Sequence, residues 1–395
     1  MVWLVCFCLS VCSSGDISQK TGVTKEMSMN KSESVNYHRY GDMQASSSLR
    51  SAGAVTGEII WQAASDSASG AAPIHLAIRD DLLVVGYGGY IEGRRRSDGE
   101  FRWGCEVAPN IDFDMNEKGI ATLDETGFYN LVGYDGRPVE EVRLNFMVDD
   151  PYLVYADIEA TEARYICYSL GKADLTPGEE PPPPYLVYAR YGLNPRELIW
   201  TFHEEGVYLG ACLSADEETV YLATPETIYV FPAGATSDME LARHRFGRHL
   251  SFSLDHEGDL LTFFETEEGR FLKKVRPDGA EMWQAAIPPG GEVRQPPASS
   301  VGGNVYLAAG SKIVIIKDGE VVREYESGAG NERIHISVLA DNSVLVAAGT
   351  MLQHLGPDGE VLLNRKMPGE LTCRPIMDNA GRVYVGGSAG LLCLE

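Results

Sequence analysis

The chain has 395 residues, of which 57 are acidic and 33 are basic, so its formal net charge is −24. Phosphate binding needs a basic face, and this composition therefore argues against nucleic acid as a partner. No apolar stretch reaches the roughly 20 residues that a membrane-spanning helix needs.

The first element is an apolar leader over residues 1–12. Val2 to Val11 form one apolar run directly before Cys12. The run has the length of an export-signal core, although no Lys or Arg precedes it. Leu9-Ser10-Val11-Cys12 is similar to a bacterial lipoprotein cleavage box, in which the cysteine becomes the lipidated first residue, but Val11 replaces the small residue expected there. Lipidation at Cys12, simple secretion and a mis-assigned start therefore stay open as alternatives.

Residues 13–54 form a polar, serine-rich segment without strand or helix pattern. Such a composition cannot bury enough apolar surface to fold alone. We predict a disordered tether between the leader and a globular body at 55–395.

The body is built from repeats. Trp-Gln-Ala-Ala occurs at Trp61 and again at Trp283, and each tryptophan follows a glycine by four residues. Trp103 follows Gly99 at the same spacing. Gly279, Gly319 and Gly359 follow one another at intervals of 40 residues. A period of this size indicates a propeller or a helical array.

The segments between these turns are short β-branched and aromatic runs, as in 304–308, 343–347 and 382–386, and none shows a long helical period. Four such runs fit into each repeat, which predicts an all-β, eight-bladed β-propeller. The predicted blades span 72–108, 109–149, 150–203, 204–247, 248–290, 291–329, 330–368, and 369–395 together with 55–64. The third contains a proline-rich insertion, Lys172 to Pro184, which must loop out of its sheet.

The last blade has three strands of its own, and the segment Thr56 to Trp61 has the form of the missing fourth. We therefore expect Ile59 and Ile60 to lie beside Leu391 to Leu394, so that the amino-side strand closes the circle and leaves no long unpaired edge.

The Gly-x-x-x-Trp endings and the strand Arg382 to Gly386 resemble the quinoprotein-type eight-bladed propellers. In that family the tryptophans at the blade ends dock between neighbouring blades. The resemblance implies a structural docking role for Trp61, Trp103, Trp200 and Trp283.

No catalytic or metal-binding pattern emerges from the remaining residues. Arg94-Arg95-Arg96 is interpreted as a solvated hairpin rather than an anion or partner site. Asp112-x-Asp114-x-Asn116 resembles the start of a calcium loop, but Asp255, Asp341 and Asp378 recur in similar turns, where Asp is a turn former. The histidines are scattered apart from His244 and His249, and we expect no bound metal or cofactor.

Five cysteines lie in the body, namely Cys105, Cys167, Cys212, Cys373 and Cys393. None has zinc-site spacing. A bridge between Cys373 and Cys393 and isolated buried thiols remain alternatives.

The sequence thus favours a non-enzymatic scaffold that is exported to the periplasm or outer membrane of a bacterium and binds proteins through inter-blade loops or strand edges, with Lys172 to Pro184 the preferred loop. The chain is similar in length and leader to the outer-membrane protein assembly factor B lipoproteins, which implies a role in envelope protein assembly. The first alternative is a quinone-dependent dehydrogenase-like enzyme, although the chain lacks the adjacent cysteine pair and the long loops of that family. An envelope propeller for another ligand and an intracellular Trp-Asp repeat propeller are the others. We expect a monomer.

Overall fold

The computed structural model describes residues 34–35 and 55–395, except for the segments 65–70, 108–112, 116–118, 124–127, 144–154, 160–162, 171–184, 193–197, 206–208, 215–217, 233–241, 290–294 and 329–332. The leader with Cys12, the proposed tether apart from 34–35 and the insertion Lys172 to Pro184 lie outside the described residues. The described residues belong to one compact unit, Glu33–Glu395. Within them no helix is long and apolar enough to cross a bilayer.

The described strands form eight antiparallel sheets, in which hydrogen-bonded neighbours are consecutive in the chain except for the pairs β1–β3 and β2–β33. The first four sheets contain β3 (His75–Arg79), β4 (Leu82–Tyr87), β5 (Tyr90–Arg95) and β6 (Phe101–Glu106); β7 (Phe113–Met115), β8 (Ile120–Leu123), β9 (Phe128–Val132) and β10 (Pro138–Arg143); β11 (Tyr155–Glu159), β12 (Ala163–Leu170), β13 (Tyr185–Gly192) and β14 (Leu198–Glu205); and β15 (Gly210–Leu213), β16 (Thr219–Ala223), β17 (Ile228–Pro232) and β18 (Ala242–His244). The short strand β1 (Ser34–Val35) pairs with β3. It lies within residues 13–54, where the sequence shows no strand pattern.

The next three sheets contain β19 (Arg248–Leu254), β20 (Leu260–Thr266), β21 (Gly269–Val275) and β22 (Glu281–Ile287); β23 (Ala298–Ser299), β24 (Asn304–Ala309), β25 (Lys312–Lys317) and β26 (Glu320–Glu326); and β27 (Ile334–Val338), β28 (Val344–Ala348), β29 (Met351–Leu355) and β30 (Val361–Lys366). The last sheet, called the closing sheet below, combines β31 (Ile376–Met377), β32 (Val383–Gly387) and β33 (Gly390–Leu394) with β2 (Ile59–Ala63).

The closing sheet joins the two ends of the body. Ile59 is the register partner of Leu394, and Ala63 that of Leu391. The backbone N–H of Gly57 donates to the carbonyl of Glu395 at 2.6 Å, which extends the ladder beyond the last strand. The predicted pairing of the amino-side strand with the carboxyl-side strands is therefore confirmed.

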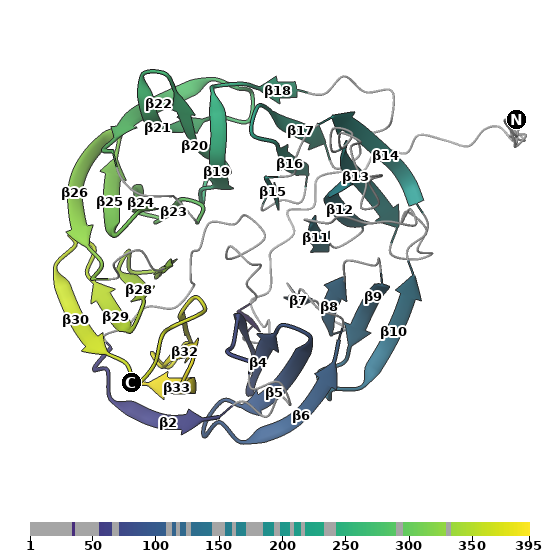
Figure 1. The fold of residues 1–395 in the computed structure, drawn as a ribbon, viewed down its shortest axis with the longest axis vertical. Helices are drawn as coiled ribbons and strands as arrows, with labels where there is room; N and C mark the ends of the chain where they lie inside the picture. Colours follow the sequence, from purple (N-terminus) through teal and green to yellow (C-terminus); the bar gives the residue numbers. More distant parts are fainter. Residues whose placement is uncertain are drawn as a thin grey trace, which may run out of the picture. The chain divides into compact units, whose positions relative to one another are not determined.

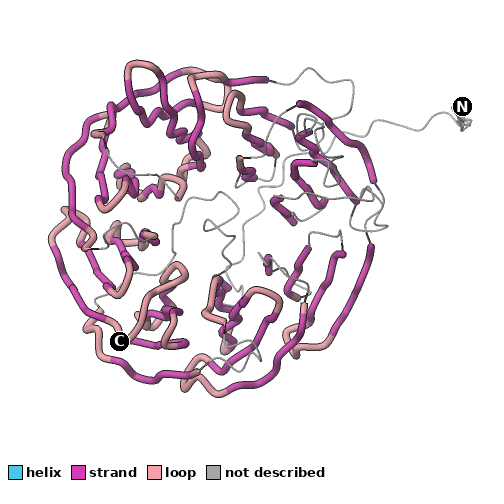
Figure 2. Tube along the Cα trace, viewed as in Figure 1, coloured by secondary structure: helices cyan, strands magenta, loops and turns pink. Residues whose placement is uncertain are grey.

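Within the described unit the sheets follow one another around a common centre, with the last strands β6, β10, β26, β30 and β2 at the rim (Figures 1 and 2). First strands of neighbouring sheets contact each other, as β11 does with β7 and β15, and β3 contacts β32 of the closing sheet. The core is made between sheets, since Tyr306 and Ile313 pack with Ile336 and Val346 of the next sheet. The molecule is an all-β propeller, as the sequence predicts.

Burial explains why inner and outer strands differ in sequence. β4 and β28 are buried at every position, because neighbouring sheets cover both faces, and they are accordingly continuous apolar runs. In the rim strand β2 half-buried and exposed positions alternate, because only one face meets a neighbouring sheet. A register shift next to the outer turn, as between Lys274 and Val275, adds to the local twist of several sheets.

Candidate functional site

The contacts between neighbouring sheets at the rim repeat around the molecule. In six sheets whose outer turn is among the described residues, the turn before the last strand holds a glycine with positive φ, and a side chain from the preceding sheet covers that glycine. A Cβ on Gly99, where φ is 73°, would lie 2.6 Å from the Cε3 atom of Trp61. Only glycine fits both the backbone angle and the packing. The pairs are Gly57 with Leu363, Gly99 with Trp61, Gly136 with Trp103, Gly279 with His244, Gly319 with Trp283, and Gly359 with Tyr325.

Three of the four tryptophans singled out from the sequence lie in this position. Trp61 in β2, Trp103 in β6 and Trp283 in β22 each pack on the turn glycine of the next sheet. The indole Nε1 of Trp103 also donates to the carbonyl oxygen of Tyr134 at 2.9 Å, which satisfies its polar atom. Trp200 lies in β14 opposite Arg190, and its side-chain contacts lie outside the described residues.

Sequence analysis missed the other docking residues because they are not tryptophans. Tyr325, His244 and Leu363 occupy the same place in sheets whose last strand lacks the tryptophan. The signal that could have found them is the receiving glycine of the following repeat, since a turn glycine implies a side chain that covers it. Tyr325 stands six residues after Gly319 rather than four, so fixed spacing fails there.

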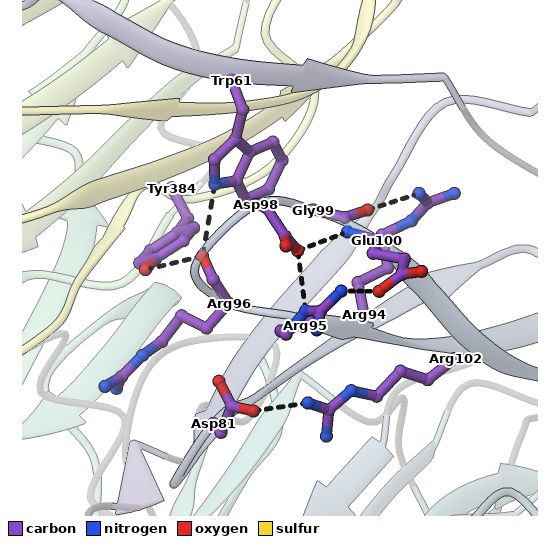
Figure 3. A network of polar contacts seen from close by, with 10 residues as sticks. All are labelled: Trp61, Asp81, Arg94, Arg95, Arg96, Asp98, Gly99, Glu100, Arg102 and Tyr384. Atoms are coloured by element: carbon purple, nitrogen blue, oxygen red, sulfur yellow. Dashed lines mark hydrogen bonds and ion pairs between the residues drawn. The ribbon is translucent and has the colours of Figure 1, made fainter.

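The arginine triplet lies at the junction between the closing sheet and the β3–β6 sheet (Figure 3). Arg94 is 3% exposed, and its Nε atom lies 2.6 Å from Oε1 of the fully buried Glu92. It also donates to the carbonyl oxygens of Gly99 at 2.9 Å and of Ala64 at 2.8 Å. Tyr87 donates its hydroxyl to the same carboxylate at 2.5 Å. The interpretation of this triplet as a solvated hairpin is therefore wrong for Arg94.

Arg96 is a second link across this junction. Its carbonyl oxygen accepts a hydrogen bond from Trp61 Nε1 at 3.2 Å. It also lies 3.4 Å from the hydroxyl of Tyr384, whose shorter bond, at 2.9 Å, goes to Oδ2 of Asp378. Trp61 and Tyr384 both belong to the closing sheet. Its Nε atom lies 3.5 Å from Oδ2 of the buried Asp378. Burial, followed by the nearby Cys393 and Asp378, raises the pKa of Tyr384, so its hydroxyl remains a donor.

Only Arg95 behaves as a hairpin residue in solvent. It pairs with Asp98 at 3.0 Å and with Glu100 in the turn, where all three side chains are at least 36% exposed. The sequence could have indicated the difference, because Glu92 and Arg94 stand two residues apart in one strand and thus share a face. Arg94 and Arg96 thus link two sheets, whereas Arg95 does not.

In the acidic turns, the aspartate carboxylates accept hydrogen bonds from backbone amides of the same turn. Oδ1 of Asp255 accepts from the amides of Glu257 at 2.9 Å and Asp259 at 3.0 Å, and Oδ1 of Asp378 accepts from Ala380 and Arg382. These are Asx-type turns, as expected from the residue type. Asp114 differs from the expected pattern, because it lies within strand β7 rather than in the turn after it.

One acidic cluster among the described residues has metal-like geometry, and a lysine fills it. Asp255, Glu257 and Asp259 surround Lys274, whose Nζ lies 2.6, 2.8 and 3.1 Å from their oxygens. Burial opposes the charged lysine, but the hydrogen bonds that it donates to Asp255 and the other carboxylates outweigh this effect and hold the pKa of Lys274 above its usual value. Calcium would have to displace this ammonium group. This cluster therefore does not fit a calcium ion as it stands, and the sequence contains no adjacent pair of cysteines.

The two histidines at the β18–β19 junction are packed against aromatic rings. Phe246 stacks on His244 with centroids 6.0 Å apart and meets His249 edge-on at 5.9 Å. His249 is 1% exposed, and its Nδ1 lies 2.9 Å from the hydroxyl of Thr262. Burial lowers the pKa of His249 to about 4. Both residues act as core side chains and not as a ligand pair.

Cys373 and Cys393, the two cysteines of the last predicted blade, are free thiols. Cys373 and Cys393 are both buried in the closing sheet and unbridged. Cys393 is the register partner of Tyr384, whereas Cys373 contacts the carbonyl of Gly386. Burial raises the pKa of each thiol to about 12, which makes them unreactive. Of the two alternatives for this pair, isolated thiols are the one observed.

No protein-family model and no curated protein sequence matches the chain. Its fold is similar to that of quinohemoprotein alcohol dehydrogenase from Comamonas testosteroni, with a TM-score of 0.64 and 10% identity over 88% of this chain and 76% of that one. Apo AztD from Citrobacter koseri aligns with a TM-score of 0.52 and 11% identity over 73% of this chain and 84% of that one.

BamB from Moraxella catarrhalis also aligns, with a TM-score of 0.37 and 12% identity over 80% of this chain and 79% of that one. A TM-score this low supports no structural argument. The likeness to the first two structures, at 10% and 11% identity, shows a similar fold and nothing more. The chain is an all-β propeller similar to the quinoprotein type.

Proposed function

We propose that this chain is a non-enzymatic scaffold that binds other proteins in the bacterial cell envelope. The observation that carries the binding function is a row of exposed apolar side chains on the rim strands. Each stands three residues after its turn glycine, where the side chain is 42–58% exposed. The row consists of Ile60 (42%), Val139 (58%), Met282 (42%), Val322 (54%) and Leu362 (52%).

The row follows from the alternation of the rim strands. In β2 the docking residue Trp61 faces the next sheet, so its neighbour Ile60 faces away from it. A single exposed apolar residue is common, but its recurrence at the same position of five sheets favours an interaction surface. This set of five side chains is called the rim row below.

The rim strands also have unused hydrogen-bonding capacity. Among the described strands, β26 and β30 each have a hydrogen-bonded neighbour on one side only, so pairing of the two chain ends still leaves these outer edges open. An open strand edge can accept an extended segment of another protein, with backbone bonds giving affinity and side chains such as Val322 giving selectivity. The rim therefore supports recognition through strand edges. The loop Lys172 to Pro184 is a second proposed contact region for protein partners.

The envelope location rests on the apolar run before Cys12 and is part of the proposal. Fractionation of cells fed labelled palmitate tests it. We expect the protein in the envelope fraction, and label that is lost in Cys12→Ser would indicate lipidation rather than simple secretion. A cytosolic, unlabelled protein would contradict this part of the proposal.

The binding function is tested with a photo-crosslinking amino acid placed at Val322 or Leu362 in cells of the source organism. We expect discrete crosslinked protein products from both positions. The matched control is Glu267, which is exposed in the β20–β21 turn away from the rim row. Leu362→Asp should reduce the products formed from position 322 several-fold. Equal crosslinking from Glu267, or none from the rim, would refute the rim as the binding surface.

The alternative function is a quinone-dependent dehydrogenase, which the structural likeness to the Comamonas enzyme favours. Purified protein incubated with the quinone and calcium would then gain dye-linked alcohol oxidation. We expect no gain, because the ammonium group of Lys274 already fills the acidic cluster that a calcium ion would need.

A further inference from the structure

Three polar residues lie in, or just before, the first strands of three consecutive sheets. Gln295 lies just before β23, His335 lies in β27, and Arg374 lies just before β31. These strands form the sheet edges opposite to β26, β30 and β2, which Figure 1 places at the rim. The group therefore lies at the inner edge of the sheets. Each of the three residues is 9% exposed.

The hydrogen bonds of Gln295 fix the tautomer of His335. The backbone N–H of Ile336 donates to Oε1 of Gln295 at 3.2 Å, so the amide nitrogen faces the imidazole. That nitrogen lies 2.9 Å from Nδ1 of His335 and donates to it. Because Nδ1 accepts a hydrogen bond, the ring hydrogen resides on Nε2.

The Nε2–H group of His335 is a buried donor without an acceptor among the described protein atoms. Most buried polar atoms in folded proteins have a partner, so a buried donor without one points to a bound group. The imidazole cannot turn to satisfy it without breaking the bond from Gln295. The donor is therefore held in place.

The surroundings of this donor are positively charged, although the chain as a whole carries a net charge of −24. Burial, with the charges of Arg374 and Arg333, lowers the pKa of His335 to about 3. At neutral pH the ring is thus a neutral donor that feels the positive charge of two guanidinium groups. A negatively charged acceptor would satisfy the donor and interact favourably with both cations.

We propose that the Nε2–H of His335 is the central donor of a binding site for a small oxyanion, a carboxylate or a phosphate, at the inner edge of β27, with Arg374 and Arg333 supplying the positive field. The site is independent of the rim row, so its failure would leave the proposed scaffold function untouched.

The first experiment follows the ring nitrogens of the full-length, ¹⁵N-histidine-labelled protein by NMR during titration with sodium phosphate, sodium sulfate and sodium acetate at constant ionic strength. We expect a saturable shift of the His335 Nε2 signal with at least one of these anions, and the comparison among them separates phosphate from carboxylate preference. Absence of any shift up to millimolar anion would overturn the site without requiring a variant.

The second experiment measures calorimetric affinity for the preferred anion in three variants. His335→Phe should weaken binding about 10- to 100-fold, since a hydrogen bond to a charged group is lost, whereas His335→Gln, which keeps a donor, should retain most of it. His249→Phe removes another buried imidazole, 1% exposed and in a different sheet, and should leave binding unchanged. Equal affinity of His335→Phe and the wild type would also overturn the proposal.

Discussion

The indole Nε1 of Trp61 donates a hydrogen bond of 3.2 Å to the carbonyl oxygen of Arg96, and the same ring covers Gly99 in the turn that follows. Trp61 belongs to the closing sheet, whereas Arg96 and Gly99 belong to the next sheet along the chain. The two ends of the body are thus joined by strand pairing and again by this side chain. Loss of the indole should loosen the junction at which closure occurs.

We expect Trp61→Ala to lower the free energy of unfolding by about 3 kcal/mol, at the low end for an aromatic residue because the ring is only partly buried. Trp61→Phe keeps much of the contact and should cost about half as much. Urea unfolding monitored by circular dichroism measures both. Trp283→Ala, at an equivalent contact away from the closing sheet, is the comparison, and a change below 0.5 kcal/mol at Trp61 would show that docking there contributes little.

The turn glycines allow strain and packing to be separated. Gly136 has φ 79°, and a Cβ there would lie 2.6 Å from Cγ of Trp103, whereas Gly258 has φ 86° with nothing within 4 Å. Gly258→Ala should therefore cost about 1 kcal/mol from backbone strain alone. Gly136→Ala should cost about 1–3 kcal/mol more, because the indole must move. Equal shifts in the urea midpoint of the two variants would contradict the packing argument.

The buried ion pair between Glu92 and Arg94 predicts strong energetic coupling. Arg94→Met leaves the carboxylate of Glu92, which is 0% exposed, without its cation and should destabilise the protein by about 3–5 kcal/mol. Adding Glu92→Gln should recover part of this loss. The coupling follows from a double-mutant cycle in urea. The exposed pair Arg95 and Asp98 on the same hairpin is the control, with an expected coupling of about 0.2–1 kcal/mol, and similar values for both pairs would refute the difference in burial as the cause.

The fold was predictable because its signals are local. Gly99 and Gly279 mark turns, β28 is a continuous apolar run, and Ile59 has the alternation of a rim strand, so strand ranges and closure followed from spacing. The partners of side chains were not predictable in the same way. Nothing near Tyr325 in the sequence shows that it covers Gly359 in the next sheet.

The arginine triplet and the inner polar group show the same limit. A run of three arginines resembles a solvated turn, and only the packing of two sheets buries Arg94. Gln295 and His335 are 40 residues apart, and their hydrogen bond exists because equivalent strands of neighbouring sheets meet at one edge. A repeat period predicts which strands are neighbours, but not which polar atoms they bring together.

The buried imidazole of His249 predicts a loss of stability in acid. Its folded-state pKa of about 4 lies below the value of about 6.5 expected in the unfolded chain, so the unfolded state takes up the proton first as the pH falls. The contribution of the neutral His249 to the free energy of unfolding is complete above pH 6.5. It is lost as the pH falls towards 4, at about 1.4 kcal/mol per pH unit. His335 acts in the same direction down to about pH 3.

The measurement is the urea midpoint at several pH values between 7 and 4.5 for the wild type and for His249→Asn. We expect the variant to be less stable at pH 7, because it loses packing against Phe246, but to have a smaller slope with pH. His256→Asn is the matched control, since that side chain is exposed on the neighbouring turn and should leave the slope unchanged. Parallel stability curves for His249→Asn and the wild type would mean that His249 titrates alike in both states, and that its burial against Phe246 and Thr262 is not maintained in solution.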